Sequence, residues 1–127
     1  MKKIFFLLAI LFAFSSCETE TFVDYFIDNQ SSSELTITGS NIISATAITS
    51  SVSAGEEKEV SSWSKLGKQT DLFEPVTMFG EDLIITNSAG DTLTKDYRVL
   101  SNWISDIDNK KSVASHKYTL LITDTDF

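Results

Sequence analysis

Apolar and polar residues alternate in several short stretches of this chain, and no stretch beyond residue 20 shows a sustained helical period. The alternation is clearest over residues 23–28 and 118–123. A period of two residues is typical of a strand that buries one face. We therefore expect one strand near the start of the folded part of the chain and another close to its C-terminus.

Other stretches predict further strands, separated by clusters of turn-forming residues. Charges alternate with Val60 over residues 57–63, which favours a strand at a sheet edge. Residues 97–107 are ambiguous, because Leu100, Trp103, Ile104 and Ile107 have helical spacing and would also fit a helix of one or two turns. The remaining expectations are a strand over 35–38 that ends at Gly39, one or two strands in 42–52, the longest loop over 64–75, a brief strand over 76–79, a strand over 83–86 and a hairpin turn over 87–91.

These elements together predict the fold class. About seven to nine short strands, spaced roughly 8–12 residues apart, are typical of an all-β sandwich. The chain has one proline and no long helical pattern. We expect a single β-sandwich domain of immunoglobulin-like type, with its topology open because the Cys-Trp-Cys pattern of antibody domains is absent.

The first seventeen residues have a different pattern. Met1-Lys2-Lys3 is basic, residues 4–14 are apolar without interruption, and Ser15-Ser16-Cys17 follows. An apolar run of eleven residues is shorter than the roughly 20 residues of a transmembrane helix and fits a signal peptide. Two small residues before a lone cysteine predict cleavage before Cys17 and attachment of diacylglycerol to its thiol.

Two alternatives to lipidation remain at this point: an ordinary signal peptide with an incidental cysteine, and an uncleaved N-terminal anchor. Phe14 stands where lipoprotein cleavage sites commonly have Leu or Val. The preferred division of the chain is a lipoprotein signal peptide over residues 1–16, a lipidated tether over 17–21 and the β-sandwich domain over 22–127.

Charge narrows the range of partners. The formal charge of the chain is −8, and loss of sixteen residues with Lys2 and Lys3 would leave 111 residues at −10. An acidic surface repels nucleic acid and anionic lipid head groups. We therefore expect no nucleic-acid partner, and membrane contact through the lipid on Cys17 alone. Because residues 18–21 reach only about 14 Å when extended, the domain should lie close to the lipid surface.

Several short sequences together resemble the small lipoproteins of the Bacteroidetes phylum, a group mostly without assigned activity. They are Phe14-Ser15-Ser16-Cys17, Ala54-Gly55-Glu56, Gly90-Asp91-Thr92-Leu93 and the ending over residues 118–127. The resemblance implies attachment to the outer membrane, on either the cell surface or the periplasmic face. It also implies that Asp91-Thr92-Leu93 matches an O-glycosylation acceptor pattern, with Thr92 as the modified residue.

Catalytic chemistry finds little support in the sequence. His116 is the only histidine, and we expect it on an exposed strand edge. No nucleophile elbow of the Gly-x-Ser-x-Gly type is present. One histidine and one acylated cysteine are too few for a zinc site. We therefore predict a non-catalytic protein without a cofactor. A hydrolase that uses two carboxylates stays open as an alternative, because acidic residues are common in this chain.

Two residue types could still bind ligands. Asp106, Asp108, Asp124 and Asp126 alternate with other residues as oxygen ligands do in calcium loops, although we favour solvated carboxylates and no metal site. Trp63 and Trp103 could stack on sugar rings or fill the core. We expect at least one of them in the core, and Trp103 is the better candidate for exposure because Asn102 and Asp106 flank it.

The function that these observations favour is a lipid-anchored binding or scaffolding module of the cell envelope, with a protein or glycan partner. One alternative is an inhibitor or immunity-type lipoprotein that binds a basic protein. The carboxylate-based hydrolase ranks below both.

Overall fold

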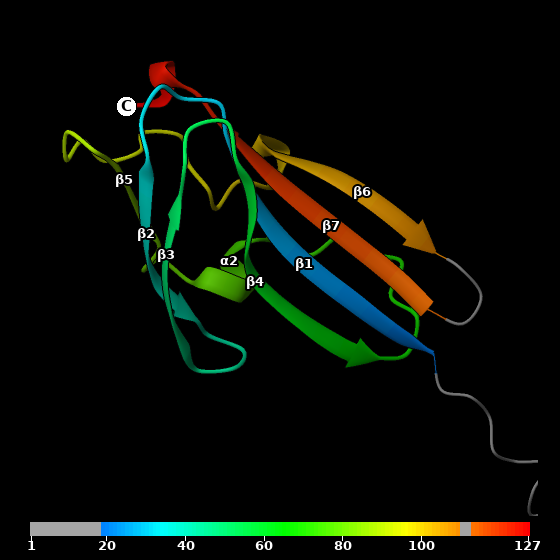
Figure 1. Ribbon diagram of the computed structural model, residues 1–127. Coiled ribbons are helices and arrows are strands. Elements are labelled where there is room, and N and C mark those ends of the chain that lie inside the picture. Colours follow the sequence, from blue (N-terminus) through cyan, green and yellow to red (C-terminus); the bar gives the residue numbers. More distant parts are fainter. Residues whose placement is uncertain (1–18, 110–112) are drawn as a thin grey trace, which may run out of the picture.

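Seven strands in the described part of the chain form two sheets that pack against each other (Figure 1). The computed structural model describes residues 19–109 and 113–127. One sheet has the order β4-β1-β7-β6 and the other β3-β2-β5. The strands are β1 (Glu20–Asn29), β2 (Leu35–Asn41), β3 (Thr46–Val52), β4 (Glu57–Leu66), β5 (Ile84–Asn87), β6 (Trp103–Asn109) and β7 (Val113–Ile122). The predicted all-β sandwich is confirmed.

The first and last strands lie side by side, in parallel, in the middle of the four-stranded sheet. Every second residue of β1 from Thr21 to Asn29 is buried, and β7 alternates in the same way from Ala114 onward. The two strongest alternating patterns in the sequence thus belong to the two strands with a neighbour on each edge. Their inward side chains supply six of the fifteen buried residues of the core cluster.

Strand β2 continues two residues past Gly39, where the sequence predicted its end. The glycine serves close packing here. A Cβ atom at position 39 would lie 3.1 Å from the Cα of Leu83 and 3.2 Å from the carbonyl oxygen of Asp82. Glycine within a strand often marks such an approach by another backbone segment.

Strand β4 lies at the edge of its sheet, as predicted, and pairs only with β1. It extends to Leu66, so the following loop begins at Gly67. Its register against β1 shifts between the pairs Tyr25↔Ser61 and Phe26↔Glu59, which leaves Val60 as the extra residue of a β-bulge.

The brief strand predicted over residues 76–79 is wrong. These residues form a single helical turn, α2 (Val76–Phe79), which follows Pro75 and buries Met78 and Phe79. Proline suits the start of a helix because its φ is already helical, and here φ is −57°. A run of four residues is too short to distinguish a strand from a helical turn by its period.

Three other segments refine the prediction. Residues 42–52 hold one strand, β3, after a turn. The ambiguous segment 97–107 divides into a 3₁₀ turn, η1 (Leu100–Asn102), and the start of β6. The turn over residues 87–91 is present, with Gly90 at a φ of +90°, but the returning chain makes only an isolated bridge between Thr86 and Thr92. A second 3₁₀ turn, η2 (Asp124–Asp126), follows β7.

No helix within residues 19–109 and 113–127 has the length and apolar character needed to cross a bilayer. The predicted signal peptide and the lipidation residue Cys17 lie outside the described residues.

Candidate binding groove

Strands β3 and β4 follow each other in the chain but belong to different sheets. Each is the outermost strand of its sheet and pairs with a neighbour on one edge only. The turn over residues 53–56 joins them, with Gly55 at a φ of +76°. Beyond this turn two strand edges face each other without pairing, and the core is open to solvent along this side of the sandwich.

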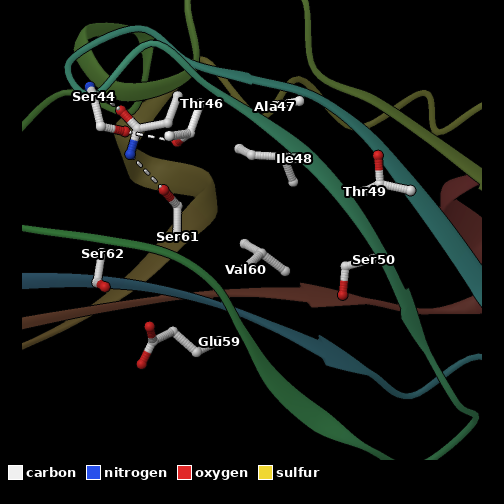
Figure 2. Close-up of a pocket in the computed structure, with 11 residues that line it drawn as sticks. Ser44, Thr46, Ala47, Ile48, Thr49, Ser50, Glu59, Val60, Ser61 and Ser62 are labelled. Atoms are coloured by element: carbon white, nitrogen blue, oxygen red, sulfur yellow. Dashed lines mark hydrogen bonds between the residues drawn. The ribbon is translucent and has the colours of Figure 1, made fainter.

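A groove of about 350 Å³ occupies the space between these edges (Figure 2). It is lined by residues 46–50 of β3 and residues 59–62 of β4, together with Asn41 and Ser44. Side chains of a strand alternate between its two faces, so a surface lined by consecutive residues is lined by the strand edge. The β3/β4 groove is therefore bounded by backbone on both sides.

Hydrogen bonds between the two sheets brace this seam. At one end, buried Asn41 donates from Nδ2 to Oγ of Ser61 over 2.8 Å, and its Oδ1 accepts from the backbone N–H of Ile43 and Ser44. Toward the turn that joins the strands, Nζ of Lys58 donates to the carbonyl oxygen of Ser51 over 2.8 Å. The groove lies between these two braces.

The floor of the groove is apolar and its walls are rich in hydroxyl groups. Ile48, 7% exposed, belongs to the core. Val60, the extra residue of the β-bulge, is partly buried and packs against the core cluster. Figure 2 shows both side chains between the strands. The walls carry the hydroxyl groups of Ser44, Thr46, Thr49, Ser50, Ser61 and Ser62. No aromatic residue lines the groove.

Negative charge borders the groove on the β4 side. Glu59 is the one charged residue among those that line it. Asp24 lies nearby on β1, opposite Ser62, and its pKa is raised by burial and by the negative charge of Glu59. Asp24 also lines a second hollow of about 220 Å³ with Phe22, Ser62, Trp63 and Ser64. The two hollows share Ser62 and together follow the edge of β4.

Trp103 does not serve as a surface stacking residue. It is only 4% exposed, and its ring centroid lies 5.4 Å from that of Tyr25 and 6.1 Å from that of Phe79. Its indole N–H donates to the carbonyl oxygen of Tyr97 over 2.6 Å. The expectation that Trp103 would be the exposed tryptophan is wrong: it begins edge strand β6, most of which is exposed, but its own ring points into the core.

Trp63 is the more accessible of the two tryptophans. It is partly exposed, lines the second hollow and packs edge-on against Phe73 with ring centroids 5.0 Å apart. Its Nε1 atom is buried and has no hydrogen-bond partner among the described residues. Any stacking role therefore falls to Trp63 rather than Trp103.

His116 is fully buried, so the prediction of an exposed position at a strand edge is wrong. It lies on central strand β7, beneath the loop over residues 67–75. Its Nε2 is 3.0 Å from the carbonyl oxygen of Gln69, and its Nδ1 is 3.2 Å from Oη of Tyr118, which accepts from the backbone N–H of Phe73. Since an N–H must face the Gln69 carbonyl, His116 ties this loop to the sheet.

The four aspartates considered for calcium separate into two pairs. Asp106 and Asp108 lie on β6 beside the first half of β7, whereas Asp124 and Asp126 follow its end. Asp124 accepts from the backbone N–H and the hydroxyl of Ser32. Asp126 accepts from Nζ of Lys95 over 2.9 Å. No group of three or more His, Cys, Asp or Glu residues suited to a metal ion occurs in the described part of the chain.

Thr92 is exposed, directly after the turn over residues 87–91. The turn is held by Asn87, which accepts through Oδ1 from the backbone N–H of Ala89 and of Asp91. The hydroxyl of Thr92 is accessible to a modifying enzyme, and its glycosylation stays a prediction.

No protein family model, curated protein or solved structure matches this chain.

The groove itself was missed in the sequence. Its residues over 44–50 fell in a stretch predicted as one or two strands of unclear register, and those over 59–62 in a predicted edge strand. The available signal was the density of Ser and Thr in two strands joined by a short turn.

Proposed function

We propose that this protein is a lipid-anchored binding module of the cell envelope that holds an extended segment of a partner polypeptide in the β3/β4 groove. The observation that carries the proposal is that consecutive residues of two edge strands line the groove. An extended segment that adds to a sheet edge bonds through its backbone and places alternate side chains in adjacent pockets. Ile48 and Val60 would receive an apolar side chain of such a segment.

The charge of the groove specifies the partner further. Glu59 and Asp24 raise the local negative potential, and among the groove-lining residues there is no cation to offset it. A lysine or arginine of the partner would bond to Glu59 and relieve the repulsion between the two carboxylates. The preferred ligand is therefore an extended segment with a basic residue beside an apolar one.

A polypeptide fits this groove better than a glycan does. Sugar rings are commonly held against aromatic side chains, and no aromatic residue lines the groove. Backbone donors and acceptors at two strand edges instead match the regular repeat of a polypeptide.

The test begins with selection of binding peptides from a random library displayed to the full protein. Selected peptides should slow hydrogen exchange of backbone amides over residues 46–50 and 59–62. Ser50→Trp, on the same face of β3 as Ile48 and within the groove lining, should abolish binding, whereas Thr36→Trp, at an exposed position of β2, should not. Peptides that bind equally well to both variants, or that protect other strands, would refute the groove as the binding site.

The contribution of Glu59 can be measured in the same assay. Glu59→Gln should weaken the binding of peptides with a basic residue about tenfold, which is the loss expected for one charge-assisted hydrogen bond. Glu34→Gln, another exposed carboxylate, is the control. Equal affinities for both variants would show that the basic residue does not bond to Glu59.

A second candidate function rests on the outer face of the four-stranded sheet. By register, this face carries the side chains of Glu20, Asp24, Asp28, Glu57, Glu59, Asp106 and Asp108. Lys117 is the only basic residue of the described strands on the same face, and it pairs with Glu57. Such a face would support inhibition of a basic protein. Association that slows steeply with salt and survives Ser50→Trp would favour this function over the groove.

A further inference from the structure

Apolar side chains gather at the end of the sandwich where the chain enters from its tether. Leu66 is 67% exposed, Val113 43% and Phe22 41%. Glu20 pairs with Leu66 on one side and with Val113 on the other. Phe22 lies two residues further along β1, on the same face as Glu20. We call Phe22, Leu66 and Val113 the tether-end patch.

The register places these three side chains around Glu20. Leu66 and Val113 lie opposite Glu20 on the two strands that flank β1, and Phe22 is the next residue of β1 on the same face. Leu66 is the most exposed of the large apolar residues that the structure describes. Soluble surfaces usually scatter such residues singly, so a group at one end indicates a contact.

The position of the predicted lipid anchor indicates that the surface in contact with the tether-end patch is the bilayer. Cys17 precedes Glu20, the first residue of β1, by three residues. Three extended residues span about 10 Å at most. If Cys17 carries lipid, the start of β1 cannot move further than this from the head-group region, whichever way the domain turns.

Local charge is compatible with a lipid surface at this end. Lys65, exposed, lies next to Leu66, and Lys68 follows in the loop, where its Nζ reaches the carbonyl oxygen of Asn109. Both cations lie near this end of the sandwich, although the protein as a whole is strongly acidic. Lysines around an apolar group are typical of segments that bind at the membrane interface.

We propose that the tether-end patch rests in the head-group region of the bilayer, so that the folded domain itself contacts the membrane. This changes the expectation that the lipid alone makes the contact. The lipid supplies attachment, and Phe22, Leu66 and Val113 set the orientation of the domain by burying apolar surface at the interface. The inference stands apart from the groove, since it concerns other residues.

The test uses the protein produced with its own leader and reconstituted in vesicles of phosphatidylethanolamine and phosphatidylglycerol. Because acylated Cys17 has no free thiol, Leu66→Cys or Val113→Cys supplies the single site for an environment-sensitive fluorophore. Ile84→Cys on β5 and Ile104→Cys on β6 are controls, 52% and 60% exposed. Quenchers attached to lipid chains should act on labels at 66 and 113, and a water-soluble quencher on labels at 84 and 104.

Equal access of the water-soluble quencher to all four labels would overturn the proposal, as would stronger lipid quenching at 84 or 104. Protein that does not float with vesicles would overturn it as well. Loss of peptide binding in Ser50→Trp bears only on the groove, so the two proposals fail separately.

A second measurement needs no substitution. A water-soluble acylating reagent should modify Lys65 and Lys68 several-fold more slowly on vesicles than in detergent after extraction, while the rate at Lys58 stays the same. An unchanged rate at Lys65 and Lys68 would refute contact at this end.

Discussion

The inner face of β1 and β7 and the seam between β3 and β4 are both built from strands, but they differ in how their edges are satisfied. β1 and β7 each have a paired strand on both sides. Over their inner face the rings of Tyr25, Phe79, Trp103 and Tyr118 pack with centroids 5.1 to 6.1 Å apart. β3 and β4 each leave one edge unpaired, and only Ile48 and Val60 close the core between them.

The difference shows what each region can do. Backbone groups between β1 and β7 are consumed by pairing, and the aromatic side chains above them exclude water. Along the outer edges of β3 and β4, the backbone N–H and C=O groups are not paired with another strand. Small hydroxyl side chains surround them and leave room for another chain. Stability is therefore concentrated in the first region, and the proposed binding site lies in the second.

Replacing each tryptophan in turn tests most directly where the stability of the core lies. Trp103→Ala should lower the free energy of unfolding by about 3–5 kcal/mol, because it empties the centre of the ring cluster. Trp63→Ala should cost about 1–2 kcal/mol, since Trp63 is partly exposed. Urea unfolding measures both. Equal losses would show that the core is not concentrated on the inner face of β1 and β7.

The next largest loss of stability is expected where Asn41 links the two sheets at one end of the seam. Asn41→Ala should destabilise the protein by about 2 kcal/mol, because Ser61 and two backbone N–H groups lose a buried partner. Thr49→Ala, in the exposed wall of the groove, should change stability by less than about 0.5 kcal/mol. Thermal unfolding of the pair is the measurement. A large loss for Thr49→Ala would contradict an open groove.

Two stacked tyrosines in the core differ in whether their hydroxyl groups have hydrogen-bond partners. Oη of Tyr118 bonds to Phe73 and His116, whereas Oη of Tyr25 is buried with no partner among the described residues. Tyr118→Phe should cost about 1–2 kcal/mol, and Tyr25→Phe should be neutral or stabilising. Chemical denaturation of both variants tests this. A loss on Tyr25→Phe equal to that of Tyr118→Phe would mean that the Tyr25 hydroxyl is satisfied in solution.

The smallest effect concerns charge beside the groove. Burial and the charge of Glu59 raise the pKa of Asp24 in the folded protein above its unfolded value. A raised carboxyl pKa stabilises the fold below the unfolded pKa of about 4, and this stability is lost as pH rises through the folded pKa. Asp24→Asn should therefore gain less than about 1 kcal/mol near pH 7 and nothing near pH 3.

Unfolding measured across this pH range tests the Asp24 prediction. Glu59→Gln should give a smaller gain in the same direction, since Glu59 is the lesser of the two causes. A gain for Asp24→Asn that persists near pH 3 would point to a cause other than ionisation.

How far the fold could be predicted depended on which strands had two neighbours. Alternation located β1, β2 and β7, where burial of one face imposes it. The charges around Val60 correctly placed β4 at an edge. Local pattern failed at Val76–Phe79, where a run of four residues serves equally for a strand or a helical turn, and at Gly39, whose role depends on Leu83 from a distant part of the chain.

The groove and the position of Trp103 were beyond reach for a related reason. Both depend on which strands lie next to each other, and no residue within β3 or β4 specifies that the two strands belong to different sheets. The neighbours of Trp103 are polar because β6 has an exposed outer face, while its ring points inward to Tyr25. Sequence showed the polar face and not the direction of the ring.

The place of β1 between β4 and β7 has a mechanical consequence. Nine residue pairs join β1 to β4, and ten join β1 to β7 along its other edge. A pull between the proposed lipid anchor and a partner held on β4 would enter along β1 and cross to β4 through their nine pairs, so it would load that ladder in shear rather than open one bond at a time, while β7 holds β1 from the other side. If the chain is anchored at Cys17 as proposed, β1 is the strand best placed to carry tension between the anchor and whatever the protein holds.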